Sequence, residues 1–183
     1  MGGKMSLQTK CTGGDGLGAC YSGTVRVISN EPFAADTWKI TLAAPDFAPL
    51  VAPGQFAMLR LPEAADPLLG RPFAVYDADP DSGRVALIYL VVGKMTKRLT
   101  HVAAGDTLEL TGPLGNGWSV IERGKGAISG GAISGGAISN SSISDGTLPF
   151  DRLVMVAGGV GQTPFYLLAK KYAALKNGPV LTL

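Results

Sequence analysis

Cysteine and histidine are scarce in this chain of 183 residues, which has only Cys11, Cys20 and His101. Two thiols cannot hold an iron–sulfur cluster by themselves, and we interpret them as reduced thiols in a glycine-rich segment. The single histidine is expected at an exposed helix end, not as a catalyst. No Ser/His/Asp set and no metal-ligand spacing is present, so the sequence predicts no catalytic side chain and no metal site.

Long runs of charge and of apolar residues are also missing. The 16 basic and 14 acidic residues are scattered and give a formal net charge of +2, which predicts neither nucleic-acid nor membrane binding. The longest apolar stretch, near Leu87–Val92, is far shorter than a membrane span. Because Met1–Met5 lacks the apolar core of a signal peptide, we expect a cytoplasmic protein.

Short strands dominate the middle of the chain. Apolar and polar residues alternate between Gly, Pro and Asp turns, which favours an antiparallel β barrel over residues 21–120. The predicted strands are 24–28, 37–42, 55–61, 73–76, 84–92 and 107–110. One short helix is expected at about 95–102, and Gly112–Gly117 is interpreted as a turn-forming connector.

The pattern changes to α/β after residue 151. Arg152–Ala157 is a continuously apolar run, typical of a strand in a parallel sheet. A glycine-rich turn follows, then a helix predicted to begin at Pro164 with Phe165, Leu168, Tyr172 and Leu175 on one face, and a second strand at 180–183. Residues 151–183 thus predict one β-α-β unit, an incomplete nucleotide-binding domain.

Two segments lack such patterns. Residues 1–20 are glycine-rich and aperiodic, and we expect a mobile leader. Residues 124–150 contain five-residue units such as Gly126-Ala127-Ile128-Ser129-Gly130, a period that fits neither a helix nor a flat strand. We interpret them as a flexible surface insertion that carries no chemistry, since small polar residues cannot offset the entropy of ordering.

Two motifs indicate nucleotide-type ligands. In Gly70–Tyr76, Arg71 precedes a proline-stiffened, aromatic strand, and its guanidinium suits a pyrophosphate because it donates two parallel hydrogen bonds. In Ala157–Pro164, a glycine-rich turn leads into a helix whose N-terminus favours a second phosphate. Two such sites in this order predict a flavin that exchanges electrons with a nicotinamide.

These motifs, with Val92–Thr96 and Gly112–Trp118 between them, resemble the ferredoxin reductase-like flavoproteins. The Gly-Pro-Leu-Gly-Asn-Gly-Trp stretch is similar to that of the electron transfer subunit of type B dihydroorotate dehydrogenase. The resemblance covers about residues 22–183. It implies a six-stranded Greek-key barrel that binds FAD, a domain that binds NAD, and a cysteine-ligated [2Fe-2S] centre. It further implies a catalytic dihydroorotate dehydrogenase subunit as partner in a heterotetramer.

The resemblance also implies roles for individual residues. Arg71 would bind the FAD pyrophosphate, Pro72, Phe73 and Ala74 would lie along the flavin, and Thr96 would offer a hydroxyl at a helix N-terminus that meets phosphate. The implied cofactor-binding residues are Arg71, Pro72, Phe73, Ala74, Ile88, Tyr89, Leu90, Met95 and Thr96, with Gly158, Gly159, Gly161 and Thr163 for the nicotinamide nucleotide.

The chain departs from the family pattern at three places. Ala74 stands where serine is usual, Met95 stands where glycine is usual, and no cluster cysteines precede Leu183. We therefore expect this chain alone not to complete the electron path. NAD and NADP are not distinguished.

Several alternatives stay open. The chain could be a reductase component of another redox system, such as an oxygenase. It could also be a non-catalytic FAD-binding module. Arg71 could be a surface arginine and the glycine turn purely structural. Tyr76 and Tyr89 suit barrel packing as well as flavin stacking.

Overall fold

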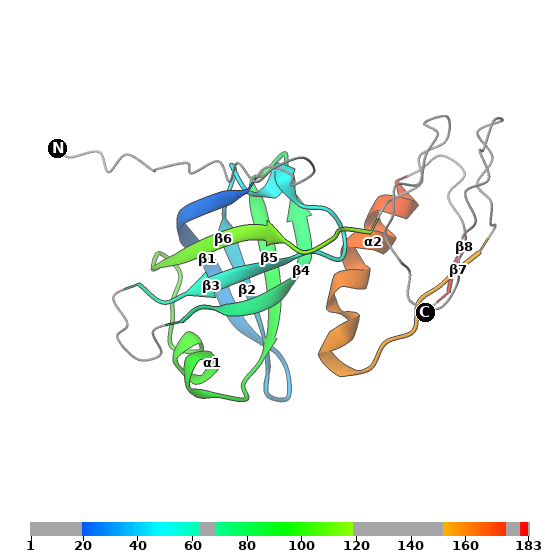
Figure 1. Cartoon of the computed structure of the whole chain (residues 1–183). Coiled ribbons are helices and arrows are strands. Elements are labelled where there is room, and N and C mark those ends of the chain that lie inside the picture. Colours follow the sequence, from blue (N-terminus) through cyan, green and yellow to red (C-terminus); the bar gives the residue numbers. More distant parts are fainter. Residues whose placement is uncertain (1–19, 63–68, 119–151, 175–179, 183) are drawn as a thin grey trace.

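Six strands close into an antiparallel barrel in the computed structural model, which describes residues 20–62, 69–118, 152–174 and 180–182 (Figure 1). The order around the barrel is β1-β2-β5-β4-β3-β6. The strands are β1 (Tyr21–Ala34), β2 (Thr37–Ala43), β3 (Phe56–Arg60), β4 (Arg71–Asp79), β5 (Arg84–Leu90) and β6 (Thr107–Leu114). The predicted six-stranded antiparallel barrel is confirmed.

β1 is much longer than the predicted strand at 24–28 because it pairs with two neighbours. Its first part, Tyr21–Arg26, pairs with β6, and the part from Arg26 onward pairs with β2. A single long strand thereby connects β6 to β2 in the barrel. Each partner satisfies the backbone groups of a different half, so the strand does not end at Ile28.

The interpretation of Gly112–Gly117 as a connector is wrong for its first three residues. β6 continues through Leu114, with Gly112 opposite Tyr21 and Leu114 opposite Phe56. Gly and Pro indicate turns locally. Here the two neighbouring strands extend the ladder past them.

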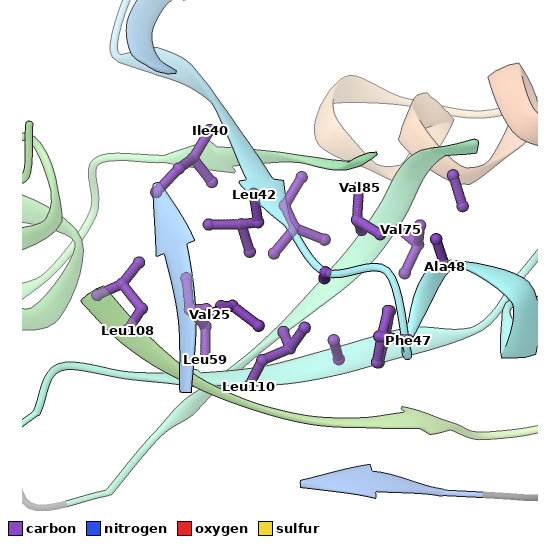
Figure 2. Packing of buried hydrophobic residues seen from close by; sticks show 14 of the residues in the cluster. Val25, Ile40, Leu42, Phe47, Ala48, Leu59, Val75, Val85, Leu108 and Leu110 are labelled. Atoms are coloured by element: carbon purple, nitrogen blue, oxygen red, sulfur yellow. The ribbon is translucent and has the colours of Figure 1, made fainter. Parts of the chain in front are cut away.

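The barrel interior is filled by alternate residues of the strands, as a period of two requires (Figure 2). Ile40 and Leu42 of β2 are fully buried with Val85 and Leu87 of β5. Phe47 closes one end from the segment before the 3₁₀ helix η1 (Ala48–Leu50), and Tyr21 contacts it edge-on with ring centroids 6.1 Å apart. Most of this apolar core comes from the strands, and Met95 and Leu99 of the segment after β5 also belong to it.

The ladder between β4 and β5 covers only part of each strand. It runs from the pair Asp79–Arg84 to the pair Val75–Leu87 and ends there. The first part of β4, Arg71–Ala74, pairs with β3 alone, while the last part of β5, Ile88–Leu90, pairs with β2 alone. Pro72 has no N–H to donate to a continued ladder. The barrel wall is therefore open between these two segments.

The helix α1 (Lys94–Leu99) follows β5 and is shorter than the predicted 95–102. The Asn30 amide of β1 donates to the carbonyl oxygens of Leu99 (2.7 Å) and Val102 (3.0 Å). A side chain from a distant strand thus satisfies carbonyls at the end of the helix, where intrahelical partners run out.

The C-terminal part contains the parallel strands β7 (Arg152–Val154) and β8 (Val180–Thr182), the 3₁₀ helix η2 (Gly159–Gln162) and the helix α2 (Thr163–Ala173). This is the predicted β-α-β unit. The helix begins one residue earlier than predicted, so Pro164 is its second residue. Leu168 and Tyr172 are buried as expected, and Leu167 is buried as well.

Other expectations fall outside the described residues. They are the leader up to residue 19, the insertion at 124–150, and Leu175. Within the described part of the chain, no helix combines the length and hydropathy needed to span a bilayer.

Candidate functional site

A cavity of about 530 Å³ lies between the open part of the barrel wall and the beginning of α2. The separated ends of β4 and β5 form one side, α1 and the segment before it form the rim, and η2 and α2 form the other side. The lining residues are Arg71, Pro72, Phe73, Ala74, Ile88, Tyr89, Leu90, Val92, Gly93, Lys94, Met95, Thr96, Val160, Gly161, Thr163 and Pro164.

The cavity brings together nearly all residues that the sequence singled out. Only Gly158 and Gly159 do not line it. The sequence interpretation missed Val92, Gly93, Lys94, Val160 and Pro164 as site residues. All five lie inside the motifs Val92–Thr96 and Ala157–Pro164. Their position in a motif could have identified them as site residues, whereas their residue types could not.

The charge on the cavity wall is positive. Arg71 and Lys94 carry the only formal charges among the lining residues, and no carboxylate is present there. The Arg71 side chain is exposed, and its Nη1 donates to the carbonyl oxygens of Gly70 (3.2 Å) and Leu69 (3.4 Å). Hydrogen bonds to neutral carbonyl oxygens leave the positive charge of the guanidinium uncompensated, so it can attract an anion. Among the described residues, no group of three acidic, cysteine or histidine side chains is placed to hold a metal ion.

The rest of the lining on β4 and β5 is apolar. Pro72 and Ala74 on β4 face the same space as Ile88 and Leu90 on β5, across the gap in the ladder. Behind them the rings of Phe73 and Tyr89 meet edge-on at 5.9 Å. A flat aromatic ligand would find few polar groups to desolvate here.

Tyr89 is a wall residue whose hydroxyl is already used. The side chain is buried, and its hydroxyl donates to Asn30 Oδ1 at 3.0 Å. Burial raises the pKa of Tyr89 to about 12, and the bond to Asn30 opposes that rise. The burial of the side chain and the bond of its hydroxyl to Asn30 favour the packing interpretation of this residue.

Thr96 uses its hydroxyl inside the chain. Its Oγ1 accepts from the backbone N–H groups of Val92 (3.1 Å) and Gly93 (3.0 Å) and donates to the Gly93 carbonyl oxygen (3.0 Å). The hydroxyl expected to be offered to a phosphate is thus engaged at the start of α1. Thr96 shapes the turn that lines the cavity, with Met95 buried beside it.

The glycine-rich turn stands in open space. A Cβ atom added at Gly158, Gly159 or Gly161 would meet no atom of the described chain within 4 Å. Next to the turn, Thr163 is buried and its Oγ1 has no hydrogen-bond partner among the described residues. A buried hydroxyl without a partner is unfavourable, and this one lies at the start of α2.

These features define the ligand that would fit. Two cations suit a diphosphate, the apolar gap suits a flat ring system, and the α2 N-terminus suits a second anion. The residues present therefore fit a dinucleotide with an aromatic head group.

Comparison with known proteins agrees with this chemistry. Residues 24–118 match the family described as the oxidoreductase FAD-binding domain. This range begins inside β1, includes the other five strands of the barrel and ends at Trp118.

Among curated proteins, the chain is similar to the electron transfer subunit of dihydroorotate dehydrogenase B (NAD(+)) from Geobacillus thermodenitrificans. The two are 34% identical over 147 residues, covering 80% of this chain and 48% of the relative. The subunit of the same name from Desulforamulus reducens is 30% identical over 151 residues. The chain spans about half the length of these curated relatives.

Among solved structures, the chain is similar to an NADH-dependent reduced ferredoxin-NADP oxidoreductase described for flavin-based electron bifurcation. The TM-score is 0.61 at 27% identity, over 93% of this chain and 48% of the other. The chain thus resembles a ferredoxin-NADP oxidoreductase in its fold as well as in its sequence motifs.

Proposed function

The chain belongs to the family of oxidoreductase FAD-binding domains, and from this premise we propose that it is the FAD-binding part of an electron transfer subunit of type B dihydroorotate dehydrogenase. The observation that carries the proposal is the cavity, because the residues implied by the family resemblance line it from three separate segments. The names of the curated relatives supply the more specific assignment.

The chain's own residues would bind and orient FAD. Arg71 and Lys94 would hold the pyrophosphate by charge, and the apolar walls of β4 and β5 would pack against the isoalloxazine. When bound, FAD supplies hydride exchange with a nicotinamide and single-electron exchange with an iron–sulfur centre.

No side chain need transfer a proton in this scheme. Tyr89 is neutral and bonded to Asn30. His101 lies outside the lining of the cavity, exposed, with Nδ1 2.9 Å from the Lys97 carbonyl oxygen. The protein's part is to exclude water with apolar walls and to hold two ligands in register.

The second nucleotide would bind at the start of α2. Gly161 and Thr163 line the cavity there, and the open space at Gly158 and Gly159 leaves room for a phosphate. The names of the relatives support NAD as this nucleotide and a catalytic dihydroorotate dehydrogenase subunit as the partner. The heterotetramer is what the family resemblance implies, and a place in cytoplasmic pyrimidine biosynthesis stays a prediction.

A second candidate is the reductase component of another redox system. It is favoured by the solved NADH-dependent oxidoreductase, which aligns with nearly the whole chain at 27% identity. The two candidates share the FAD site and differ in the partner. Co-purification with a catalytic dihydroorotate dehydrogenase subunit from a joint expression supports the first, and failure of that complex favours the second.

The FAD site is tested with Arg71→Ala. Removing the guanidinium leaves a bound pyrophosphate short of its cation, and we expect FAD binding to weaken by about 2–4 kcal/mol. The measurement is FAD affinity by titration, with the released flavin identified as FAD and not FMN after denaturation.

Arg84→Ala is the matched control, since Arg84 is an exposed arginine at the other end of β5 and does not line the cavity. It should bind FAD as the wild type does. Equal FAD affinity in the Arg71 and Arg84 variants would contradict the assignment of the cavity.

A further inference from the structure

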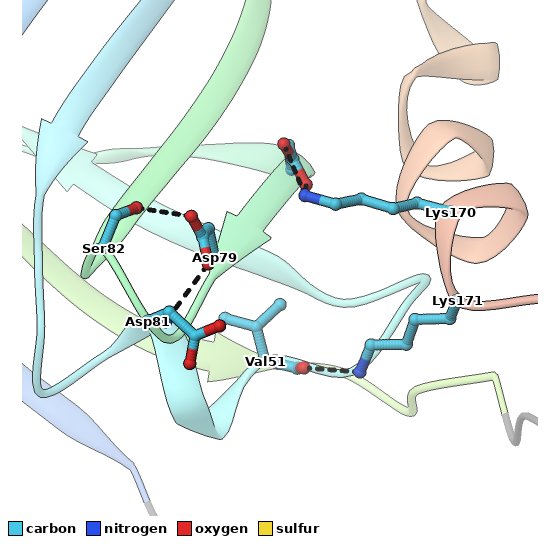
Figure 3. Close-up of polar contacts among 7 residues, drawn as sticks. Val51, Asp79, Asp81, Ser82, Lys170 and Lys171 are labelled. Atoms are coloured by element: carbon cyan, nitrogen blue, oxygen red, sulfur yellow. Dashed lines mark hydrogen bonds and ion pairs between the residues drawn. The ribbon is translucent and has the colours of Figure 1, made fainter. Parts of the chain in front are cut away.

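α2 is held against β4 by two directional contacts at neighbouring residues. The rings of Tyr76 and Tyr166 stack with centroids 4.4 Å apart and planes 17° from parallel. Next along β4, both carboxylate oxygens of Asp77 accept from Lys170 Nζ, at 2.9 and 3.1 Å (Figure 3). Tyr166 and Lys170 are four residues apart and so share one face of the helix.

The same two elements form facing sides of the cavity. β4 contributes Arg71–Ala74, which ends two residues before Tyr76, and α2 contributes Thr163 and Pro164, which end two residues before Tyr166. Any rotation of α2 away from β4 therefore moves Thr163 and Pro164 relative to the barrel wall.

We propose that Tyr76, Asp77, Tyr166 and Lys170 form a clamp that sets the separation between the flavin wall and the nucleotide-binding start of α2. They are positioning residues, since none of them lines the cavity. The inference rests on the proposed function for the identity of the two ligands, but the clamp itself is a property of the described contacts.

The other contacts of α2 hold the helix without fixing its direction as tightly. Leu167 is buried in the barrel core, and Phe165 meets Trp118 at 5.3 Å and 41°. Lys171 Nζ donates to the Val51 carbonyl oxygen at a long 3.4 Å (Figure 3). Apolar burial is non-directional, whereas a stacked pair and a two-oxygen ion pair have defined geometry. Hydrogen bonding to Asp77 raises the pKa of Lys170, so the ammonium stays charged at neutral pH.

The first test measures amide hydrogen exchange across residues 163–174 in the full chain. Lys170→Ala and Tyr166→Ala each remove one half of the clamp, and we expect exchange in α2 to become roughly fivefold faster while the barrel strands keep their protection. Lys97→Ala, which removes an exposed lysine of α1, is the control and should leave α2 unchanged.

Rescue separates positioning from general stability. Exchanging the charges, with Asp77→Lys and Lys170→Asp together, should restore slow exchange in α2. Tyr166→Phe keeps the stacked ring and should behave as the wild type does.

The second test uses iodide quenching of the fluorescence of bound FAD. A released α2 opens one wall of the cavity, so Lys170→Ala and Tyr166→Ala should raise the quenching constant about twofold or more, while FAD affinity stays within about twofold of the wild type. The charge-exchanged variant should return to the wild-type quenching constant.

Each outcome decides the proposal. Unchanged exchange in both single variants overturns the clamp. Loss of FAD affinity in parallel with faster exchange, without rescue by the charge exchange, overturns the positioning role in favour of a merely structural one. If the wild-type chain binds no FAD, the proposed function fails, and the exchange measurements still decide whether the clamp exists.

Discussion

Tyr89 and Asn30 connect the cavity wall to the end of α1. The Tyr89 hydroxyl donates to Asn30 Oδ1, and the Asn30 amide donates to the carbonyl oxygens of Leu99 and Val102. This side-chain pair thus joins β5, β1 and the segment after α1. The three hydrogen bonds are partly buried, and losing the phenol removes the donor to the Asn30 amide oxygen.

The raised pKa of Tyr89 makes a prediction about stability at high pH. Its folded pKa of about 12 lies above the ordinary value of 10.0, so the unfolded chain ionises first as pH rises. The stability that Tyr89 contributes is complete below pH 10 and is lost as pH rises through 12. We expect Tyr89→Phe to flatten the fall in the free energy of unfolding between these values.

This is measured by urea unfolding of the wild type and the variant across the same pH series. At neutral pH, Tyr89→Phe should be less stable by about 1 kcal/mol through the lost hydrogen bond. Parallel pH profiles for the two proteins would show that Tyr89 is not the titrating group.

At the scale of elements, the turn before β3 both reverses the chain and contacts Trp118. Gly54 has φ +85°, and a Cβ there would stand 2.7 Å from the Trp118 indole. The backbone N–H of Trp118 donates to the Pro53 carbonyl oxygen at 2.6 Å, and the Trp118 ring packs on Phe165 of α2. The turn therefore positions Trp118, and Trp118 connects the end of the barrel to α2.

Gly54→Ala should be more destabilising than Gly105→Ala. Both glycines have positive φ, which costs an alanine about 1–2 kcal/mol, but a Cβ at Gly105 meets nothing within 4 Å. The clash with Trp118 should add about 1–3 kcal/mol at Gly54. Urea midpoints of the two variants test this, and equal midpoints would mean that Trp118 moves aside without loss.

At the scale of the whole molecule, the barrel and α2 behave as one packed unit. Leu167 of α2 is buried in the same cluster as Val75 of β4 and Leu59 of β3. The cavity lies at the junction of the two parts and depends on both. The residues between Trp118 and Arg152 lie outside the described chain.

Deleting Gly126–Thr147 should leave melting temperature and FAD content nearly unchanged. The prediction comes from the sequence, whose five-residue units of small and polar residues offer no core, and from the slow growth of loop entropy with length. Thermal unfolding followed by circular dichroism measures it. Replacing the same residues by a Gly/Ser segment of equal length controls for chain length, and a large fall in melting temperature would show that the units pack.

The sequence by itself determined the six strands, the β-α-β unit and most of the cavity lining. Alternation of apolar residues and the turn residues between strands are local signals, readable wherever one face of a strand is buried. Arg71 and the glycine turn were recognisable because phosphate chemistry requires those residue types.

Only the tertiary structure decided how these parts meet. The open ladder between Ala74 and Ile88 and the stack of Tyr76 on Tyr166 both depend on the arrangement of segments in space. The inclusion of Gly112–Leu114 in β6 has the same origin, because the partners on both sides supply the pairing. Local patterns indicate which residues form strands, helices and turns, whereas contacts between distant residues follow from the packing free energy of the whole chain.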